Sequence, residues 1–527
     1  MVWASVEALT APGPAKLAAG LADKRIGQLA VGAPAVLLVV VVGAFLRIWQ
    51  LDSVGYNTDE AVYAGQAAAI ADDPILKQFF PIFRAHPILF QALLSLAFQF
   101  GVSDLFGRLV AAGIGVVTVF LVYLIGRELY GRGAGLLAAL LLALMPYHVV
   151  VTRQVLLDGP MTLFSTLTLY TLVRFGLTQR AIWLYAAGAG FGLTLLSKTN
   201  GVVMVGALYT TLALSPSLRV RLRDLAVAIV CMGLVVAAYP VTVSLAGRSE
   251  IGRQYLAWQL FRRPNHDWSF YATTVPEAIG ILVVLAALTG LWLLRRERSW
   301  REMLLVSWIV VPVAFFQLWP TKGFQYLLPI APAFAVLASR ALTRWEVRPL
   351  QRRRFGRLDH AWARGILAAV VAISLVIPTW RRIQPADSDL FLAGSGGVPG
   401  GREVGAWISD NVPEGAEMLA LGPSMANIIQ FYGHRKAYGL SVSPNPLHRN
   451  PSYEPVNNPD LRIRNNEIQY LVWDSFSAAR TPFFSNALLQ HVNKYHGRVV
   501  HTESVTASTP AGETTQKPVI VVYEVRP

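Results

Sequence analysis

Two adjacent carboxylates follow the first long apolar run of the chain, in the stretch YNTDEAVYAGQ at residues 56–66. A carboxylate near its ordinary pKa can accept the proton of an attacking hydroxyl, so Asp59 is a candidate general base. Glu60 points about 100° away on a helix and is expected to cap or pack. Capping also competes as an explanation for both acids, since Asn57 or Thr58 before acids is typical of a helix start.

A second acid and several basic residues could complete a site. Asp158 opens the segment LLDGPM, Lys198 follows a glycine-rich apolar run in LLSKTNG, and Lys322 precedes QYLLP. Positive charge stabilises a phosphate leaving group, which then needs no general acid. Simpler explanations compete, because an acid at a span start can be a cap and interfacial lysines commonly snorkel. The other candidates for phosphate contact are His86, Arg153 and Tyr326.

The composition is that of a polytopic α-helical membrane protein. Of 527 residues, 54% are hydrophobic and only 15% are charged, against about 25% charged in ordinary soluble domains. Apolar runs of about 20 residues recur, each long enough to cross a bilayer. The net charge of +15 arises in short loops between these runs, so the expected partner is the lipid bilayer and not nucleic acid. The single cysteine, Cys231, excludes an intramolecular disulfide and a thiolate cluster.

Loop charges set the expected topology. A basic cytoplasmic segment, residues 1–28, precedes an uncleaved first helix. If the short run 87–100 crossed the membrane, strongly basic loops such as RRERSWR would fall outside, against the positive-inside rule. We therefore predict about eleven transmembrane helices within the module 29–380. Residues 50–103 then form the first outer loop, with interfacial helices at about 59–71 and 87–100.

This topology collects the candidate residues on the outer side. The outer loop 247–275 adds Arg262, Arg263 and His266 as candidates for acceptor or loop contacts, together with Tyr63 and Glu60. Charge midway along spans, or discontinuous helices in matched halves, would instead indicate a transporter. Neither is evident, but a transporter or flippase that binds a lipid-linked sugar through the same polar groups remains an alternative.

After residue 385 the composition changes to that of a small α/β domain. The segment REVGAWISDNVPEGAEMLALG predicts a helix, a turn and a strand. IQYLVWDS, GRVVHTESV and PVIVVYEV predict further strands, with a helix at about 480–495. The segment 441–466 is expected to be an irregular loop. With about eleven crossings, the domain 385–527 lies outside the cytoplasm.

The order of these motifs resembles the membrane glycosyltransferases of the C superfamily. DE-x2-Y, HP-x-L, R-x4-D-x-P, SK after a glycine-rich helix and K-x2-QYLLP follow one another within roughly residues 29–341. The set is similar to bacterial relatives of protein O-mannosyltransferases and of the lipid A aminoarabinose transferase. The resemblance implies that Asp59 is the general base and Asp158 the second outer-loop acid. It also implies that Lys198 and Lys322 are the basic groups near the donor phosphate.

The chain departs from that pattern at two positions. Ile88 replaces a second proline that the relatives carry after the position of Pro87, and Gln325 stands where relatives often carry arginine. A phosphate contact missing at Gln325 could come from Arg262 or Arg263. His266 resembles a position that faces the acceptor in the relatives.

The residues and the resemblance together predict an inverting glycosyltransferase. No nucleotide sugars are available outside the membrane, so the sugar is expected on a polyprenyl-phosphate carrier. Direct attack inverts the anomeric carbon, whereas retention would need a second carboxylate as nucleophile. Asp158 is expected to orient other groups instead. No cofactor or metal is predicted, although a divalent ion bridging Asp59 and Asp158 is an alternative.

The acceptor stays open between a glycan, a lipid and a protein. A polymerase or ligase that uses pyrophosphate-linked glycans shares most of this chemistry. The expected location is a bacterial inner or plasma membrane, with the active site and the C-terminal domain extracytoplasmic.

Overall fold

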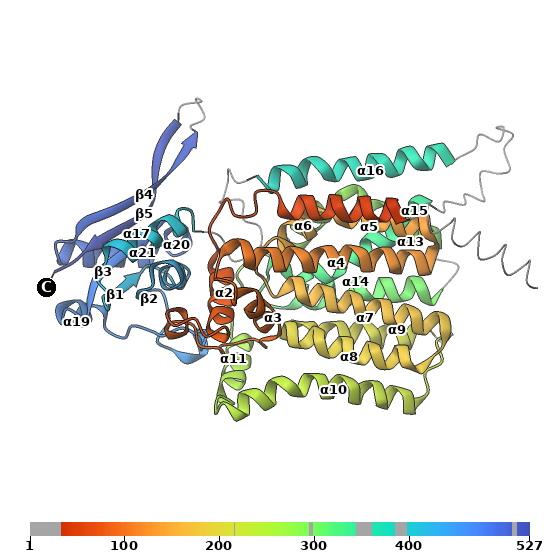
Figure 1. Ribbon diagram of the computed structural model, residues 1–527, viewed down its shortest axis with the longest axis horizontal. Helices are drawn as coiled ribbons and strands as arrows, with labels where there is room; N and C mark the ends of the chain where they lie inside the picture. Colours follow the sequence, from red (N-terminus) through yellow and green to blue (C-terminus); the bar gives the residue numbers. More distant parts are fainter. Residues whose placement is uncertain are drawn as a thin grey trace, which may run out of the picture.

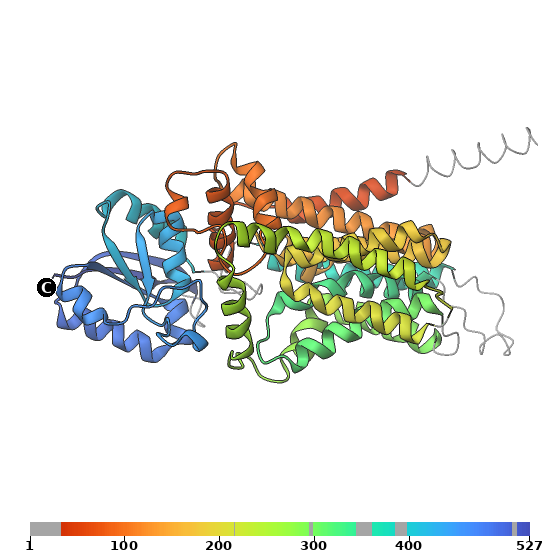
Figure 2. The ribbon, with the colours of Figure 1, turned by 90° about the horizontal axis from the view of Figure 1, so that it is seen from below.

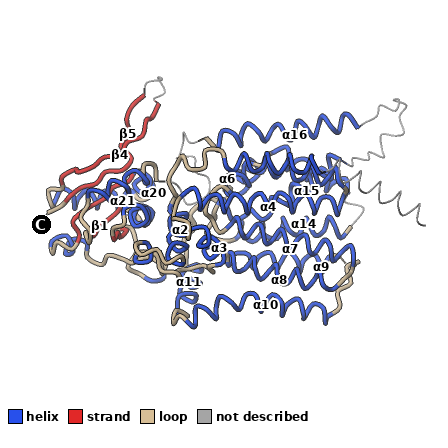
Figure 3. Tube along the Cα trace, in the orientation of Figure 1, coloured by secondary structure: helices blue, strands red, loops and turns tan. Residues whose placement is uncertain are grey.

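The protein consists of a long helical bundle, a small α/β domain and a layer of short helices between them (Figure 1). The computed structural model describes residues 33–215, 217–294, 299–343, 361–384, 398–508 and 514–526. The predicted cytoplasmic segment 1–28 lies outside these residues. Strands occur at one end of the molecule and helices make up the other (Figure 3).

The bundle is formed by apolar helices, most of which run along one common direction (Figures 1 and 2). They are Ala33–Ile48, α4 (Asp104–Tyr130), α5 (Arg132–Leu144), α6 (Pro146–Thr152), α7 (Asp158–Thr178), α8 (Ala181–Ser197), α9 (Val203–Leu214), α10 (Leu222–Leu245), α12 (Phe270–Ile279), α13 (Ile281–Leu294), α14 (Trp300–Leu318), α15 (Ala331–Thr343) and α16 (Ala361–Arg382). The α5–α6 pair is bent by 60° and the α12–α13 pair by 95°.

Within the described ranges, five helices are long and apolar enough to cross a membrane, or up to seven if each bent pair is one span. The count of about eleven crossings therefore stays a prediction. The outer surface of the bundle suits lipid, because large apolar side chains face outward, such as Leu234 of α10 and Ile373 of α16, which are 72% and 62% exposed.

The first outer loop forms the layer at one end of the bundle. It contains α2 (Thr58–Ile70), the 3-10 turn Leu76–Gln78 and α3 (Leu89–Phe98), close to the two predicted interfacial helices. With 10 residues, α3 is about 15 Å long, half of what a membrane span needs. A further short helix, α11 (Glu250–Leu260), lies at the same end (Figure 2).

The C-terminal domain is a five-stranded mixed sheet with helices. Its elements are α17 (Gly401–Asn411), β1 (Glu417–Ala420), α18 (Pro423–Ile428), β2 (Lys436–Gly439), η7 (Pro446–His448), α19 (Pro459–Arg464), β3 (Ile468–Asp474), α20 (Ser475–Arg480), α21 (Pro482–Lys494), β4 (Arg498–Ser508) and β5 (Thr514–Glu524). The strand order is β2-β1-β3-β5-β4, with β1 parallel to β2 and β3, and β5 antiparallel to β3 and β4.

The four strands and two helices predicted in this domain are present. The strand β2 was not predicted, because four residues of KAYG show too little alternation to indicate a strand. The predicted irregular loop 441–466 contains two short helical elements, η7 and α19.

The domain is fixed onto the first outer loop by polar and apolar contacts. The Tyr432 hydroxyl accepts from the Tyr56 backbone N–H at 2.6 Å and donates to Asp104 at 2.5 Å. The Thr58 hydroxyl donates to the Ser424 carbonyl at 3.0 Å. One apolar cluster includes residues of α2 and of the domain, among them Phe431. The domain therefore packs against α2 and covers it.

Candidate active site

The two carboxylates at the start of α2 have different environments. The Asn57 side chain accepts from the backbone N–H groups of Asp59 and Glu60, each at 3.0 Å. The Glu60 carboxylate in turn accepts from the Asn57 N–H at 3.0 Å. This reciprocal capping confirms the competing explanation for Glu60. It also fixes the direction in which the neighbouring Asp59 side chain leaves the helix.

Glu60 is buried in an ion pair that joins three segments. Its carboxylate accepts from Arg108 of α4 at 2.7 and 2.8 Å and from the Val155 N–H at 3.0 Å. Arg108 also donates to the Leu51 carbonyl at 3.0 Å. All acceptor capacity of Glu60 is thus used within the fold, so Glu60 positions α2 and does not face a substrate.

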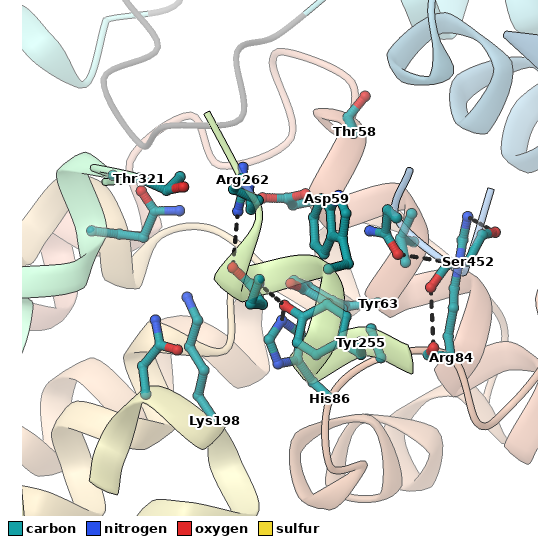
Figure 4. Close-up of a pocket in the computed structure, with 18 of the residues that line it drawn as sticks. Thr58, Asp59, Tyr63, Arg84, His86, Lys198, Tyr255, Arg262, Thr321 and Ser452 are labelled. Atoms are coloured by element: carbon teal, nitrogen blue, oxygen red, sulfur yellow. Dashed lines mark hydrogen bonds between the residues drawn. The ribbon is translucent and has the colours of Figure 1, made fainter. Parts of the chain in front are cut away.

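Asp59 lines a cavity of about 340 Å³ between the bundle and the C-terminal domain (Figure 4). Its carboxylate has no hydrogen bond or ion pair to any part of the chain that the structure describes. Burial raises the pKa of Asp59 to about 6, against the opposing influence of Lys198. A carboxylate with this pKa is ionised at neutral pH and is a stronger base than a solvated one.

The cavity floor is built around Lys198, which follows the last residue of α8. Its Nζ donates to both carboxylate oxygens of Asp158 at 2.7 and 2.8 Å, and both side chains are buried. Nζ also lies 4.8 Å from the ring centroid of Tyr326. Asp158 itself is behind Lys198 and does not line the cavity. Its position agrees with the expectation that this acid orients another group.

The glycines of α8 explain how Lys198 reaches this place. A Cβ at Gly188 would lie 2.1 Å from the carbonyl oxygen of Ala228 in α10, and one at Gly190 would lie 2.5 Å from Thr168 of α7. Only glycine allows these helices to approach so closely, as in other membrane bundles. The close packing brings the end of α8 beside the start of α7, where Asp158 lies.

Lys322 lines the same cavity from the connection that precedes the 3-10 helix Phe324–Ile330. Asn265 holds its backbone in place through two hydrogen bonds of 2.8 Å each. The Lys322 Nζ lies 5.5 Å from the ring centroid of Trp268 and makes no ion pair among the described residues. Its charge is therefore free to meet an anion in the cavity.

His86 belongs to a chain of hydrogen bonds along one wall (Figure 4). Arg262 donates to the Gln259 side-chain oxygen at 3.4 Å, and the Gln259 amide nitrogen donates to the Tyr255 hydroxyl at 2.6 Å. That hydroxyl is hydrogen-bonded to His86 Nε2 at 3.0 Å. Burial and the nearby cations Lys198 and Arg262 lower the pKa of His86 to about 3. The ring is neutral at pH 7, so it supplies a hydrogen bond and no charge.

The other predicted residues are distributed unevenly. Tyr63, Tyr326 and Arg262 line the cavity. Arg153 does not, because its guanidinium donates to the carbonyls of Leu46 and Trp49 at 2.8 and 2.7 Å. His266 is exposed and stacks on Phe270 at 4.0 Å, and Arg263 lines a different cavity.

The C-terminal domain contributes four residues that no sequence pattern predicted. Ser424, Asn450, Ser452 and Tyr453 line the cavity. Arg84 donates to the Ser452 carbonyl at 3.3 Å, and its guanidinium lies 5.5 Å from the ring centroid of Tyr453. Arg84 precedes the HP motif by two positions and could have been suspected. The domain residues carry no local signal, since their segment shows only the Pro and Asn of a loop.

The site combines one free carboxylate with a concentration of positive charge. Asp59 shares the cavity with Lys198, Lys322 and Arg262, and among the described residues Lys198 alone of these three is paired with an acid. No group of three or more His, Cys, Asp or Glu side chains that could hold a metal occurs in the described residues. The arrangement suits a reaction in which a proton leaves one substrate and a phosphate anion leaves the other.

The chain is similar to one protein family over part of its length and to several solved structures. The family model described as dolichyl-phosphate-mannose-protein mannosyltransferase matches residues 85–243. No curated protein matches the sequence closely enough to count as a relative. The fold is similar to solved structures, although the sequence identities are low.

ArnT from Cupriavidus metallidurans in the apo state has a TM-score of 0.67 at 16% identity, over 93% of this chain and 98% of that one. The same protein bound to undecaprenyl phosphate has a TM-score of 0.64 at 15% identity, over 92% of this chain and 97% of that one. A third structure is the archaeal oligosaccharyltransferase AglB from Archaeoglobus fulgidus in complex with an inhibitory peptide and a dolichol-phosphate. It has a TM-score of 0.57 at 14% identity, over 92% of this chain and 74% of that one.

Proposed function

We propose that the chain is a membrane glycosyltransferase of the C superfamily and that its donor is a sugar linked to a polyprenyl phosphate. Similar structures have been solved with undecaprenyl phosphate and with a dolichol-phosphate, which supports a lipid-linked donor. The observation that carries the proposal is the shared cavity, in which the free carboxylate of Asp59 faces Lys198 and Lys322.

In the proposed reaction an acceptor hydroxyl attacks the anomeric carbon of the sugar. The new carbon–oxygen bond forms while the bond from that carbon to the phosphate oxygen breaks, and the electron pair stays on the phosphate. The acceptor proton passes to Asp59. One displacement inverts the configuration, and no second carboxylate is required.

The leaving phosphate is proposed to bind between Lys198 and Lys322. Two of the three N–H bonds of Lys198 are directed at Asp158, which leaves one for the phosphate. Lys322 and Arg262 add charge that no acid of the described chain neutralises by an ion pair. Cations placed where negative charge develops stabilise the transition state without reorganisation.

We propose that the site lies on the outer face of the membrane. The loops at the opposite end of the bundle are basic: Arg180 joins α7 to α8, and Arg219 and Arg221 lie between α9 and α10. The positive-inside rule assigns such loops to the cytoplasm. The cavity, α2 and the C-terminal domain would then be extracytoplasmic. No metal and no cofactor are proposed for the reaction.

The test is a donor screen with the purified full chain in detergent. Polyprenyl-phosphate sugars are incubated with a cell-envelope lipid extract, and release of the free carrier lipid is followed by mass spectrometry. Release from a monophosphate donor is expected. Release only from pyrophosphate-linked glycans would favour a polymerase or ligase, and movement of intact lipid across liposomes without any covalent change would favour a flippase.

A further inference from the structure

A second cavity, of about 620 Å³, lies between the end of α11 and the C-terminal domain. Figure 2 shows α11 between the bundle and the domain, running across the direction of the bundle helices, and α11 contacts η7 there. The cavity is lined by Trp258, Phe261, Arg262, Arg263, Leu440, Ser441, Val442, Ser443, Pro444, His448, Val456 and Phe484. None of the chemistry described above uses this space.

The second cavity adjoins the catalytic cavity. Trp258 and Arg262 line both. The Arg262 guanidinium lies 4.6 Å from the ring centroid of Trp258, so these two side chains together form the partition. A ligand held in the second cavity therefore lies next to the catalytic cavity, at the wall formed by these two side chains. That is the position an acceptor needs, because its hydroxyl must reach the base while the donor phosphate occupies the lysine end.

The lining identifies the chemistry of such a ligand. Aromatic rings, notably Phe261 and Phe484, offer apolar faces, while Ser441 and Ser443 offer hydroxyls. The charged side chains are the two arginines, and no Asp or Glu belongs to the lining. These groups match the parts of an acidic sugar. The aromatic rings can stack on its C–H faces, the serine hydroxyls can bind its hydroxyls, and the guanidinium groups can bind its carboxylate.

A peptide fits this cavity less well. An extended peptide commonly binds by adding a strand to a sheet edge. The lining comes from α11, from loops, from η7 and from α21, and no lining residue belongs to a strand. Main-chain recognition of that kind is therefore not offered by these residues.

We propose that the second cavity is an acceptor subsite for an acidic glycan, a saccharide that carries a carboxylate next to its hydroxyls. The proposal rests on the proposed function, since it names the acceptor class of that reaction. Arg263, which lines the second cavity but not the catalytic one, binds the carboxylate. Arg262, which lines both cavities, meets the part of the glycan nearest the catalytic cavity.

The test is direct binding to the purified full chain. A fluorescently labelled tetragalacturonate, a labelled maltotetraose and a labelled acidic tetrapeptide are each titrated against wild type, Arg263→Ala and Ser443→Trp. Tetragalacturonate is expected to bind wild type. Its affinity should fall roughly tenfold in Arg263→Ala, which loses a charged contact, and in Ser443→Trp, which fills the space. Arg253→Ala removes an exposed arginine of α11 outside both cavities and is the matched control.

Equal binding of the neutral and acidic saccharides, or no binding of either, would overturn the proposal. So would tighter binding of the tetrapeptide with the same dependence on Arg263. Binding of undecaprenyl phosphate to each variant shows that it is folded. The donor screen is independent of this result: carrier release without glycan binding refutes the subsite alone, and glycan binding without carrier release refutes the reaction alone.

Discussion

Replacing Asp59 by asparagine should stabilise the protein, and the gain in stability should be larger above the pKa of this carboxylate than below it. The pKa of Asp59 is raised from 3.8 to about 6 in the fold, chiefly by burial. Between those values the folded state binds more protons than the unfolded state, so stability falls as pH rises through this window. Above it, the folded protein carries the full cost of a buried charge that asparagine does not have.

The size of the effect follows from the shift. A pKa change from 3.8 to about 6 lowers the free energy of unfolding of wild type by about 3 kcal/mol at pH 8 and by about 1 kcal/mol at pH 4.5. The gain in stability should therefore differ by about 2 kcal/mol between the two pH values. Any effect of exchanging aspartic acid for asparagine that does not depend on pH cancels in this difference. With an unfolding entropy of about 1 kcal/mol/K for a chain of this size, it amounts to roughly 2 °C in the unfolding temperature.

The assay is thermal unfolding of wild type and Asp59→Asn in one detergent at both pH values. The gain in Tm of the variant should be larger at pH 8 than at pH 4.5. Asp410→Asn removes an exposed carboxylate of the C-terminal domain and controls for net charge. An equal gain at both pH values, or a variant less stable than wild type at pH 8, would refute the reasoning. The second result would mean that the surrounding cations outweigh burial.

Other substitutions test the remaining contacts. Lys198→Met leaves the buried Asp158 unpaired, so we expect the free energy of unfolding to fall by about 3–5 kcal/mol, measured by Tm. We also expect weaker binding of undecaprenyl phosphate, measured by titration. Unchanged lipid binding would show that Lys198 does not contact the phosphate. Glu60→Gln should cost a similar amount because Arg108 loses its partner, and adding Arg108→Met should recover part of it in the same Tm assay; no recovery would show that the pair is not the cause. A cysteine at Val102 should react with an impermeant maleimide from outside the cell, whereas labelling only from the cytoplasm would reverse the proposed orientation.

The pattern of residue types was enough to find the parts of the site that lie at helix ends. Asp59, Lys198 and Lys322 each interrupt an apolar run at a point that hydropathy locates well. The periodicity and length of apolar runs also predicted α2, α3 and four of the five strands of the C-terminal domain, because these properties determine such elements locally.

Contacts between distant segments could not be predicted in this way. The partner of Glu60 is Arg108, 48 residues away, and nothing in either segment indicates the other. Arg153 sits near Asp158 in the sequence, yet it turns to carbonyls of the first helix. Tyr453 reaches the cavity from a loop whose composition indicates only irregular backbone. Pairing of this kind depends on the tertiary fold and is invisible to periodicity.

The most direct test of the central claim compares carrier-lipid release by wild type and Asp59→Asn, with a donor that wild type uses. The account predicts that the variant binds undecaprenyl phosphate as wild type does but releases carrier roughly 100- to 10,000-fold more slowly, the usual cost of losing a general base. It also predicts that wild-type release falls below a pH of about 6, where Asp59 becomes protonated. Equal release by the two proteins, with the same pH profile, would contradict the assignment of Asp59 as the base.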